Sequence, residues 1–202
     1  MAYRVSYRGN RGFTLGPVGF LIIINIIMFI VTTIRPELIY TIPLGLSRQE
    51  FTSSPWTVIT NLFIHAGIWH ILANMLTLYF FGSYLSRLAG DRNFLIIYFL
   101  GGLLGNVVFL LLAPSNYMAI GASGAVFAVA GALTVLRPKM TVFIIPIPVP
   151  IPLWIAVLGG FVLLSIPAFA FDQNIAWQAH LGGLVVGLIA GLFFRRKQRR
   201  FY

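Results

Sequence analysis

The sequence predicts an all-α integral membrane protein with six transmembrane helices. Of its 202 residues, 59% are hydrophobic and 9% are charged, a composition too apolar for a soluble fold of this size. Apolar runs separated by glycine, proline and polar residues define the candidate spans. These spans cover about residues 17–34, 69–87, 94–112, 123–136, 152–166 and 177–194, and we expect residues 1–202 to form one membrane domain.

The first three spans each have their own signal. Pro17 suits the first position of a helix, where its missing N–H breaks no hydrogen bond. No small-residue cleavage site follows this first run, so we expect a retained span rather than a signal peptide. The third span is an apolar run interrupted only by a few small and polar residues. The second follows a stretch typical of a membrane interface, which contains Trp56, His65 and Trp69.

The last three spans are shorter or more interrupted. The run 123–136 is short for a span, so its first turn must begin below the membrane surface. The next segment, residues 146–152, has proline at every second position and cannot donate to a strand ladder there. We expect it to be an extended connector at the membrane surface. The fifth span should end at Ile166, and the sixth should end before a basic run.

Positive charge is strongly asymmetric about these spans. If six helices cross the membrane, only Arg35 and Arg48 fall on one side. The positive-inside rule makes the crowded side cytoplasmic and puts both termini there. That side holds the other twelve basic residues: Arg4, Arg8, Arg11, Arg87, Arg92, Arg137, Lys139, Arg195, Arg196, Lys197, Arg199 and Arg200.

The charge and cysteine content exclude several classes of function. The net charge of +10 sits at the ends of apolar runs, and no basic stripe with interleaved aromatics predicts nucleic-acid binding. The expected surrounding partner is therefore the lipid bilayer. The absence of cysteine excludes disulfides, thiolate chemistry and a zinc–cysteine site.

Four polar side chains on three parallel spans share one membrane depth. Ser123 and His180 lie fourteen and fifteen residues from the basic end of their spans, and Asn74 lies thirteen. At a rise of about 1.5 Å per residue these sites are about 20–23 Å from the cytoplasmic edge. In a hydrocarbon core about 30 Å thick they lie about 8 Å below the outer face. His70 is one turn further out, on the same face as Asn74. Polar groups at such a depth are usually functional.

These residue types predict acyl-transfer chemistry. A serine hydroxyl becomes a nucleophile when a neighbouring base such as a neutral histidine takes its proton, which pairs Ser123 with His180. The backbone N–H of Ser123 at a helix N-terminus favours a developing oxyanion, and His70 and Asn74 can add side-chain donors. No carboxylate can orient the histidine, which predicts a dyad and not a triad. All four acids lie in expected loops: Glu37, Glu50, Asp91 and Asp172.

Small residues provide the close approach that a dyad needs. Small side chains recur at intervals of four on the sixth span, and others surround Ser123. Packing these faces together should bring His180 over Ser123, with Phe127, one turn below, against the imidazole. The small residues are Ala179, Gly183, Gly187 and Gly191 on the sixth span, and Gly121, Ala122, Gly124 and Ala125 around the serine.

Three motifs carry a family resemblance. Gly121-Ala122-Ser123-Gly124, Ala179-His180-Leu181-Gly182-Gly183 and His70-x-x-x-Asn74, in order across six spans, resemble a rhomboid intramembrane serine protease of the prokaryotic six-helix form. The resemblance implies a rhomboid-like bundle in which Ser123 is the nucleophile and His180 the general base. It also implies that His70 and Asn74 belong to the oxyanion site and that no cofactor is needed.

The resemblance further implies the substrate and the location. Rhomboid proteases cleave transmembrane protein substrates near their outer ends, and these substrates are thought to enter past the fifth helix and the loop after it. Here those are residues 152–166 and 167–178. The implied location is a prokaryotic cell membrane, crossed several times, with the site opening to the extracytoplasmic side.

Three positions depart from the family pattern. The family often has tyrosine where this chain has Phe127, which keeps the ring and loses a hydroxyl. A helix-two glutamate of many bacterial members corresponds to Ser86, and the first loop has no Trp-Arg pair. The last two differences concern how the first loop and the second helix are braced.

Other interpretations remain beside this one. An inactive rhomboid-like protein that binds transmembrane clients would usually lack the serine or the histidine. A transporter usually shows an internal repeat, a broken helix at mid-membrane or a coupling carboxylate, which the sequence lacks. Three histidines can hold zinc, but no H-E-x-x-H motif or nearby acid accompanies His65, His70 and His180, so we expect no metal.

Taken one at a time, several of these residues could have a purely structural role. Ser123 alone would be an N-cap, and Asn74 alone would be an interhelical hydrogen-bonding residue, as we expect for Asn25 and Asn106. His65 is expected at the mouth of the site. The glycines of the sixth span would suit a dimerisation face as well as an intramolecular contact.

Overall fold

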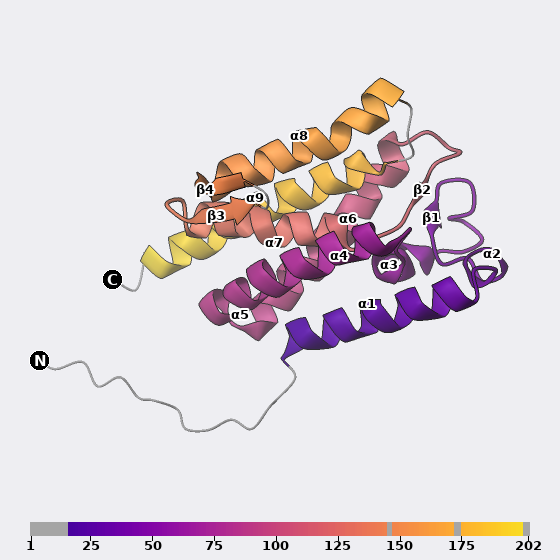
Figure 1. Ribbon diagram of the computed structural model, residues 1–202, viewed down its shortest axis with the longest axis horizontal. Helices are drawn as coiled ribbons and strands as arrows, with labels where there is room; N and C mark the ends of the chain where they lie inside the picture. The colour runs from indigo at the N-terminus through magenta and orange to yellow at the C-terminus, as the bar shows by residue number, and fades with distance from the viewer. Residues whose placement is uncertain (1–15, 145–146, 172–174, 200–202) are drawn as a thin grey trace, which may run out of the picture.

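The computed structural model describes residues 16–144, 147–171 and 175–199. Within them, long helical segments run roughly along one axis (Figure 1). The protein is therefore mainly helical. These segments are α1 (Pro17–Ile34), a continuous helix of α4 (Ile68–Thr77), η2 (Leu78–Gly82) and α5 (Ser83–Ala89), then α6 (Asp91–Leu112), α7 (Ser123–Leu136), α8 (Leu153–Phe171) and α9 (Trp177–Arg199).

Several of these helices are candidates for membrane spans. Helices α1 and α6 and residues 177–196 of α9 are each long and apolar enough to cross a membrane. Residues 57–63 and 68–89 meet the same test together, across a 93° bend. Helix α7 and the first part of α8 (Leu153–Ala168) are apolar but shorter. With 14 residues, α7 is about 21 Å long, less than a hydrocarbon core of about 30 Å.

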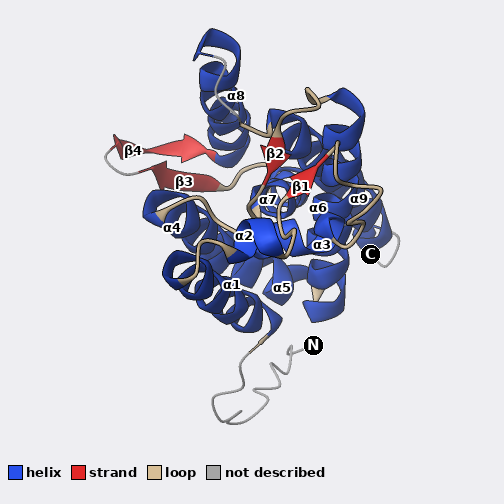
Figure 2. Cartoon of the chain, turned by 90° about the vertical axis from the view of Figure 1, so that its right-hand side faces the viewer, coloured by secondary structure: helices blue, strands red, loops and turns tan. Residues whose placement is uncertain are grey.

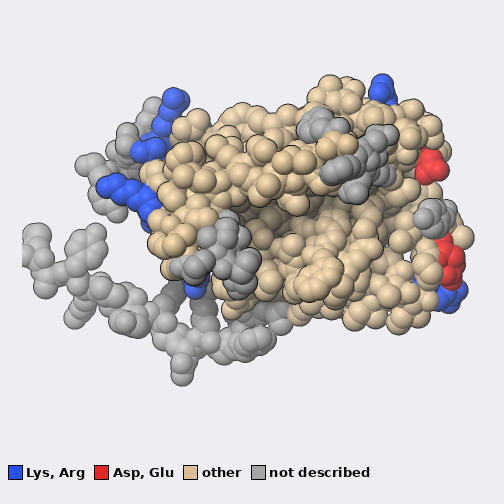
Figure 3. Space-filling view, turned by 45° about the horizontal axis from the view of Figure 1, so that its top comes forward, with Lys and Arg blue, Asp and Glu red and all other residues tan. Residues whose placement is uncertain are grey.

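The helices alternate in direction. In Figure 1, α4–α5, α7 and α9 run one way, and α1, α6 and α8 run the other, so α1 begins at the end of the molecule where α9 finishes. Figure 3 shows most of the visible Lys and Arg side chains at that same end, while the visible Asp and Glu side chains lie at the opposite end. The charge asymmetry of the sequence therefore follows the long axis of the fold.

Helix α7 is the centre of the bundle. Most of its residues are buried whichever way they face, as expected for a helix that is apolar all round. Its small side chains let α6 and α9 approach closely, and both helices pack on it. Two large buried side chains of α6, Phe94 and Tyr98, belong to the same core as the α7 residues, whereas Phe109 packs in a second cluster with Leu46.

Short elements cover the end of the bundle opposite the basic end (Figure 2). Strand β1 pairs antiparallel with β2, with Leu46 opposite Ala119 and Ser47 opposite Met118. This pairing joins the first loop to the segment that leads into α7. The elements are α2 (Leu38–Thr41), β1 (Leu46–Ser47), α3 (Thr57–Thr60), the 3₁₀ turn η1 (Asn61–Phe63) and β2 (Met118–Ala119).

The proline-rich connector is extended, as expected, and it also pairs as a strand. Strand β4 (Ile147–Pro152) forms an antiparallel hairpin with β3 (Thr141–Ile144), with Ile151 opposite Val142. Because the prolines alternate, the missing N–H groups fall on one edge of the strand, and the other edge keeps its donors. Figure 2 shows this hairpin and α8 at the side of the bundle.

Helix boundaries differ from the prediction mainly by extension. Helices α1 and α7 begin and end at the expected residues, while α6 begins three residues earlier, at Asp91. Helix α8 continues through Pro167 to Phe171, so the expected loop after Ile166 is shorter. Proline is tolerated inside membrane helices where neighbouring groups satisfy the freed backbone. The second long helix also contains a π-helical segment, η2.

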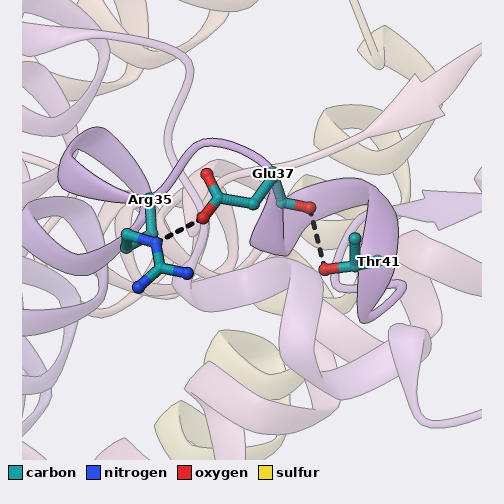
Figure 4. Close-up of polar contacts among 3 residues, drawn as sticks. All are labelled: Arg35, Glu37 and Thr41. Carbon is teal, nitrogen blue, oxygen red and sulfur yellow. Dashed lines mark hydrogen bonds and ion pairs between the residues drawn. The ribbon is translucent and has the colours of Figure 1, made fainter.

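Polar contacts stabilise the turn after α1 and the turn between α5 and α6. After α1, Arg35 donates from Nε to the Glu37 carboxylate, and Thr41 donates from Oγ1 to the Glu37 carbonyl oxygen at 3.0 Å (Figure 4). The hydrogen bond from Arg35 lowers the pKa of Glu37. Both side chains are exposed, so this pair contributes little stability. Between α5 and α6, Ser86 donates from Oγ to the Asp91 carboxylate.

Candidate active site

Ser123 is the first residue of α7 and follows a turn that requires glycine. Gly121 has a φ of +113°, a left-handed conformation that L side chains rarely adopt. Its N–H donates to the Asn61 carbonyl oxygen at 2.8 Å. Ala122 then begins the helical conformation, and Ser123 starts the helix with a free backbone N–H. The turn therefore aims the first N–H groups and the serine hydroxyl at the same region.

His180 meets this serine from the first turn of α9. The Ser123 Oγ lies 2.7 Å from His180 Nε2, a hydrogen bond between residues 57 positions apart. His180 is 7% exposed. Its other ring nitrogen, Nδ1, is buried and has no hydrogen-bond partner among the described residues. Asp172, one of the four acids, lies outside the described residues. The described part of the site is a serine–histidine pair.

Close contact between α7 and α9 brings the pair together. A β-carbon at Gly183 would overlap the carbonyl oxygen of Gly124, and one at Gly187 would overlap that of Ala128. At Gly124 a β-carbon would lie 3.1 Å from the carbonyl oxygen of Ala179. Only glycine permits so short a separation between the two backbones.

An aromatic side chain lies against the histidine ring. The ring centroids of Phe127 and His180 are 5.1 Å apart, with the planes tilted by 32°. Phe161 of α8 meets Phe127 edge-on, with the centroids 6.1 Å apart and the planes at 89°. Sequence patterns do not identify Phe161, because its contact with Phe127 depends on where α8 packs. The Phe127 ring thus lies against the imidazole, and the Phe161 ring packs against Phe127 in turn.

One ring nitrogen of His70 lies beside the turn that precedes Ser123. The Ala66 N–H donates to His70 Nδ1 at 3.3 Å. In the neutral imidazole the accepting nitrogen carries no proton, so the proton is on Nε2. A β-carbon at Gly121 would lie 2.7 Å from His70 Nε2 and 3.7 Å from Ser123 Oγ. The space beside Gly121 therefore lies between an N–H donor and the serine hydroxyl.

Asn74 and His65 are both buried. The Asn74 amide donates to the His70 carbonyl oxygen, one turn back in α4, at 2.9 Å, and one N–H of that amide is left over. His65, expected at the mouth of the site, is 3% exposed and packs edge-on against His70, with ring centroids 5.0 Å apart. The described residues contain no group of three His, Cys, Asp or Glu side chains placed to hold a metal.

A known protein family matches the part of the chain that contains these site residues. The Rhomboid domain family matches residues 52–197, well over half of the chain. The chain belongs to the rhomboid family. Together with its apolar helices, this membership makes it a multi-pass membrane protein.

Relatives of this rhomboid come from bacteria and from organelles. The Bacillus subtilis rhomboid protein YdcA is 31% identical over 162 residues, 78% of this chain and 75% of YdcA. The mitochondrial rhomboid protein 1 of Saccharomyces cerevisiae is 29% identical over 167 residues, 77% of this chain and 48% of that protein. The Bacillus subtilis rhomboid protease GluP is 34% identical over 136 residues, 67% of this chain and 25% of GluP. The chain thus spans half or less of the last two relatives.

Side-chain hydrogen bonds hold the first loop and the turn between α5 and α6 in this rhomboid. Between α5 and α6, the hydrogen bond from Ser86 to the Asp91 carboxylate holds the start of α6. In the first loop Trp56 is followed by a threonine, and the indole N–H donates to the Pro43 carbonyl oxygen at 2.8 Å. A buried amide pair, Asn61 and Asn106, joins the loop to α6. The sequence predicts a hydrogen-bonding role for Asn106 but does not identify its partner.

Proposed function

We propose that this rhomboid is an intramembrane serine endopeptidase that cleaves transmembrane protein substrates near the outer membrane face. The observation that carries the proposal is the 2.7 Å contact between Ser123 Oγ and His180 Nε2, made by two helices of a membrane bundle. A part-buried hydroxyl could form a hydrogen bond with any polar group, so the identity of its partner is informative. Here the partner is a histidine, and a nucleophile in contact with a base is what the serine-type hydrolysis of a peptide bond requires.

His180 acts as general base and then as general acid. Its Nε2 takes the hydroxyl proton as Ser123 Oγ attacks the peptide carbonyl carbon. The same nitrogen returns the proton to the departing amine when the C–N bond breaks and leaves an acyl-enzyme. Water then attacks the ester with His180 again as base, which releases the acid product and restores the serine hydroxyl. Each proton removed is returned within one cycle.

We assign three groups to the expected oxyanion site. The Ser123 backbone N–H lies at a helix N-terminus, where the dipole favours negative charge. The Nε2–H of His70 faces the space beside Gly121. Asn74 contributes its remaining amide N–H or, through its bond to the His70 carbonyl, holds the helix turn that carries this donor. Donors that are already fixed in place stabilise the tetrahedral intermediate without reorganising during the reaction.

Ring packing does the orienting that a carboxylate does in a triad. Phe127 covers one face of the imidazole and limits its rotation, and the α7–α9 contact sets its distance from the serine. Ser123 and His180 therefore act as a catalytic dyad. The residues that support it by permitting close backbone contact are Gly121, Gly124, Ala179, Gly183 and Gly187.

We further propose that the chain crosses a prokaryotic cell membrane six times with both termini in the cytoplasm. The basic residues at the end of the molecule far from Ser123 support this orientation through the positive-inside rule. The site then opens toward the extracytoplasmic side. Substrate helices would approach past α8, which packs at the side of the bundle and supports Phe127 through Phe161.

Cleavage of a panel of single-span substrates in liposomes tests the function. Wild type should produce fragments whose new ends, read by mass spectrometry, lie near the outer end of the substrate span. Ser123→Ala should produce none, and Ser115→Ala, at an exposed serine on the same end of the molecule, should cleave normally. Binding of substrates without turnover by wild type would instead identify an inactive client-binding rhomboid. Cleavage retained in Ser123→Ala would disprove the proposal.

A further inference from the structure

Two buried asparagines form a reciprocal pair outside the dyad. Asn61 donates from Nδ2 to Asn106 Oδ1 at 3.1 Å, and Asn106 donates from Nδ2 to Asn61 Oδ1 at 2.8 Å. Asn106 also donates to the Val58 carbonyl oxygen at 2.8 Å. The two residues are only 1% and 2% exposed. Each side-chain oxygen and nitrogen of the pair thus has a partner, which is what a buried amide needs.

The pair joins two parts of the protein that are distant in sequence. Asn106 belongs to α6, one of the helices that pack on α7, while Asn61 begins η1 in the first loop. The two segments also touch through Leu62, since a β-carbon at Gly102 of α6 would lie 3.0 Å from that leucine. The first loop is therefore held on α6 by shape and by specific hydrogen bonds together.

The backbone of the same asparagine holds the turn before the nucleophile. The Asn61 carbonyl accepts the Gly121 N–H at 2.8 Å. Gly121 lies two residues before Ser123, in the left-handed conformation, with His70 Nε2 directly beside it. A chain of hydrogen bonds thus leads from Asn106 through Asn61 to the wall of the expected oxyanion space.

We propose that the Asn61–Asn106 pair positions the Gly121 turn, and through it the oxyanion donors, while the α7–α9 contact independently positions the dyad. The inference rests on the proposed function, because it assigns the pair a part in catalysis and not in folding alone. Asn61 and Asn106 are positioning residues here, since neither touches the reacting atoms. Two apolar side chains of similar size could fill the same space. Only a directional pair sets the register of η1 against α6 and hence the place of the Asn61 carbonyl.

Separate control of the two parts predicts a specific kinetic signature. Breaking the amide pair should move the Gly121 turn relative to His70 without separating Ser123 from His180. Transition-state stabilisation then falls while binding of the substrate helix is unchanged, so kcat falls and KM does not. Complete loss of one oxyanion donor lowers kcat by about 10²–10³-fold. Misplacement should have a smaller effect, and we expect kcat to fall about 10–100-fold.

Kinetics of Asn106→Leu in liposomes test the inference, with Asn93→Leu as the matched control. Asn93 is also an α6 asparagine, and its amide donates to the Ala89 carbonyl oxygen at the far end of the helix. We expect Asn106→Leu to lower kcat about 10–100-fold with KM within about twofold of wild type. Asn93→Leu should leave both constants unchanged. Equal kcat values in the two variants would overturn the inference.

A second variant and a double mutant separate positioning from folding. Asn106→Asp keeps the shape and the acceptor for Asn61 but loses both donated hydrogen bonds, and it should show the same fall in kcat even if the leucine variant fails to fold. Because the two amides act as one unit, Asn61→Leu/Asn106→Leu should be no slower than either single variant. Additive losses, or a rise in KM with constant kcat, would contradict a positioning role. An inactive wild type would disprove the proposed function itself, whereas an active wild type with normal variants would disprove only this inference.

Discussion

Ser123 Oγ and His180 Nε2 lie 2.7 Å apart, although 57 residues separate them in the chain and each belongs to a different helix. Their contact depends on the small separation of α7 and α9, which glycine makes possible. The chemistry of the site is therefore linked to backbone packing, and mutations remote from the reacting atoms should affect it.

Widening the α7–α9 contact should inactivate the protein. In Gly183→Ala the new methyl group overlaps the Gly124 carbonyl oxygen, so α9 must move away from α7 and His180 must move from Ser123. We expect cleavage to fall at least about tenfold and the protein to lose about 1–3 kcal/mol of stability. Cleavage rates and thermal unfolding in the same detergent measure both effects.

Gly159→Ala is the control for this substitution. Gly159 is also a helical glycine, but no heavy atom outside its own helix turn lies within 4 Å of its β-carbon position. Its replacement should leave activity unchanged. Normal activity in Gly183→Ala would show that the close approach of the two helices is not needed for the dyad.

The imidazole should lose orientation when its aromatic neighbour is removed. Phe127→Leu keeps an apolar side chain of similar volume but removes the ring that lies 5.1 Å from the His180 ring. Aromatic pairs contribute about 0.5–1.5 kcal/mol, so we expect kcat to fall about two- to tenfold. Phe127→Tyr keeps the ring and should retain the wild-type rate. If both variants are equally active, ring packing does not orient the base.

His70 is predicted to act through its Nε2–H. His70→Phe preserves the edge-on contact with His65 and removes the donor that faces the space beside Gly121. We expect kcat to fall about 10²–10³-fold with little change in KM, as for other lost oxyanion donors. Steady-state kinetics on one substrate separate the two constants. A change confined to KM would assign His70 to substrate binding instead.

Local signals in the sequence predicted the helices more accurately than the connections. Helix α1 begins and ends as expected because Pro17 and Arg35 mark the ends of the first apolar run. Helix α7 does so because Ser123 and Arg137 mark the ends of the fourth apolar run. The proline-rich segment is extended, as expected, but its pairing with β3 was not predicted. Alternation of proline excludes donors along one edge only, and pairing along the other edge depends on the fold of β3.

The residues of the site could be proposed from depth and residue type, but their supporting contacts could not. Spacing along each helix puts Ser123, His180 and Asn74 at one level. The burial of His65, the support of Phe127 by Phe161 and the pairing of Asn61 with Asn106 are long-range contacts. No periodicity within a single segment encodes such contacts, because they arise from the packing of one segment on another.

Active-site labelling of the intact protein is the most direct measurement of the dyad. A fluorophosphonate probe reacts with a serine whose hydroxyl is activated by a base. Tandem mass spectrometry of the labelled wild-type protein should find the adduct on Ser123, and His180→Ala, shown to be folded by its thermal transition, should remain unlabelled. An adduct on another residue, or full labelling of Ser123 in His180→Ala, would contradict the claim that His180 activates Ser123.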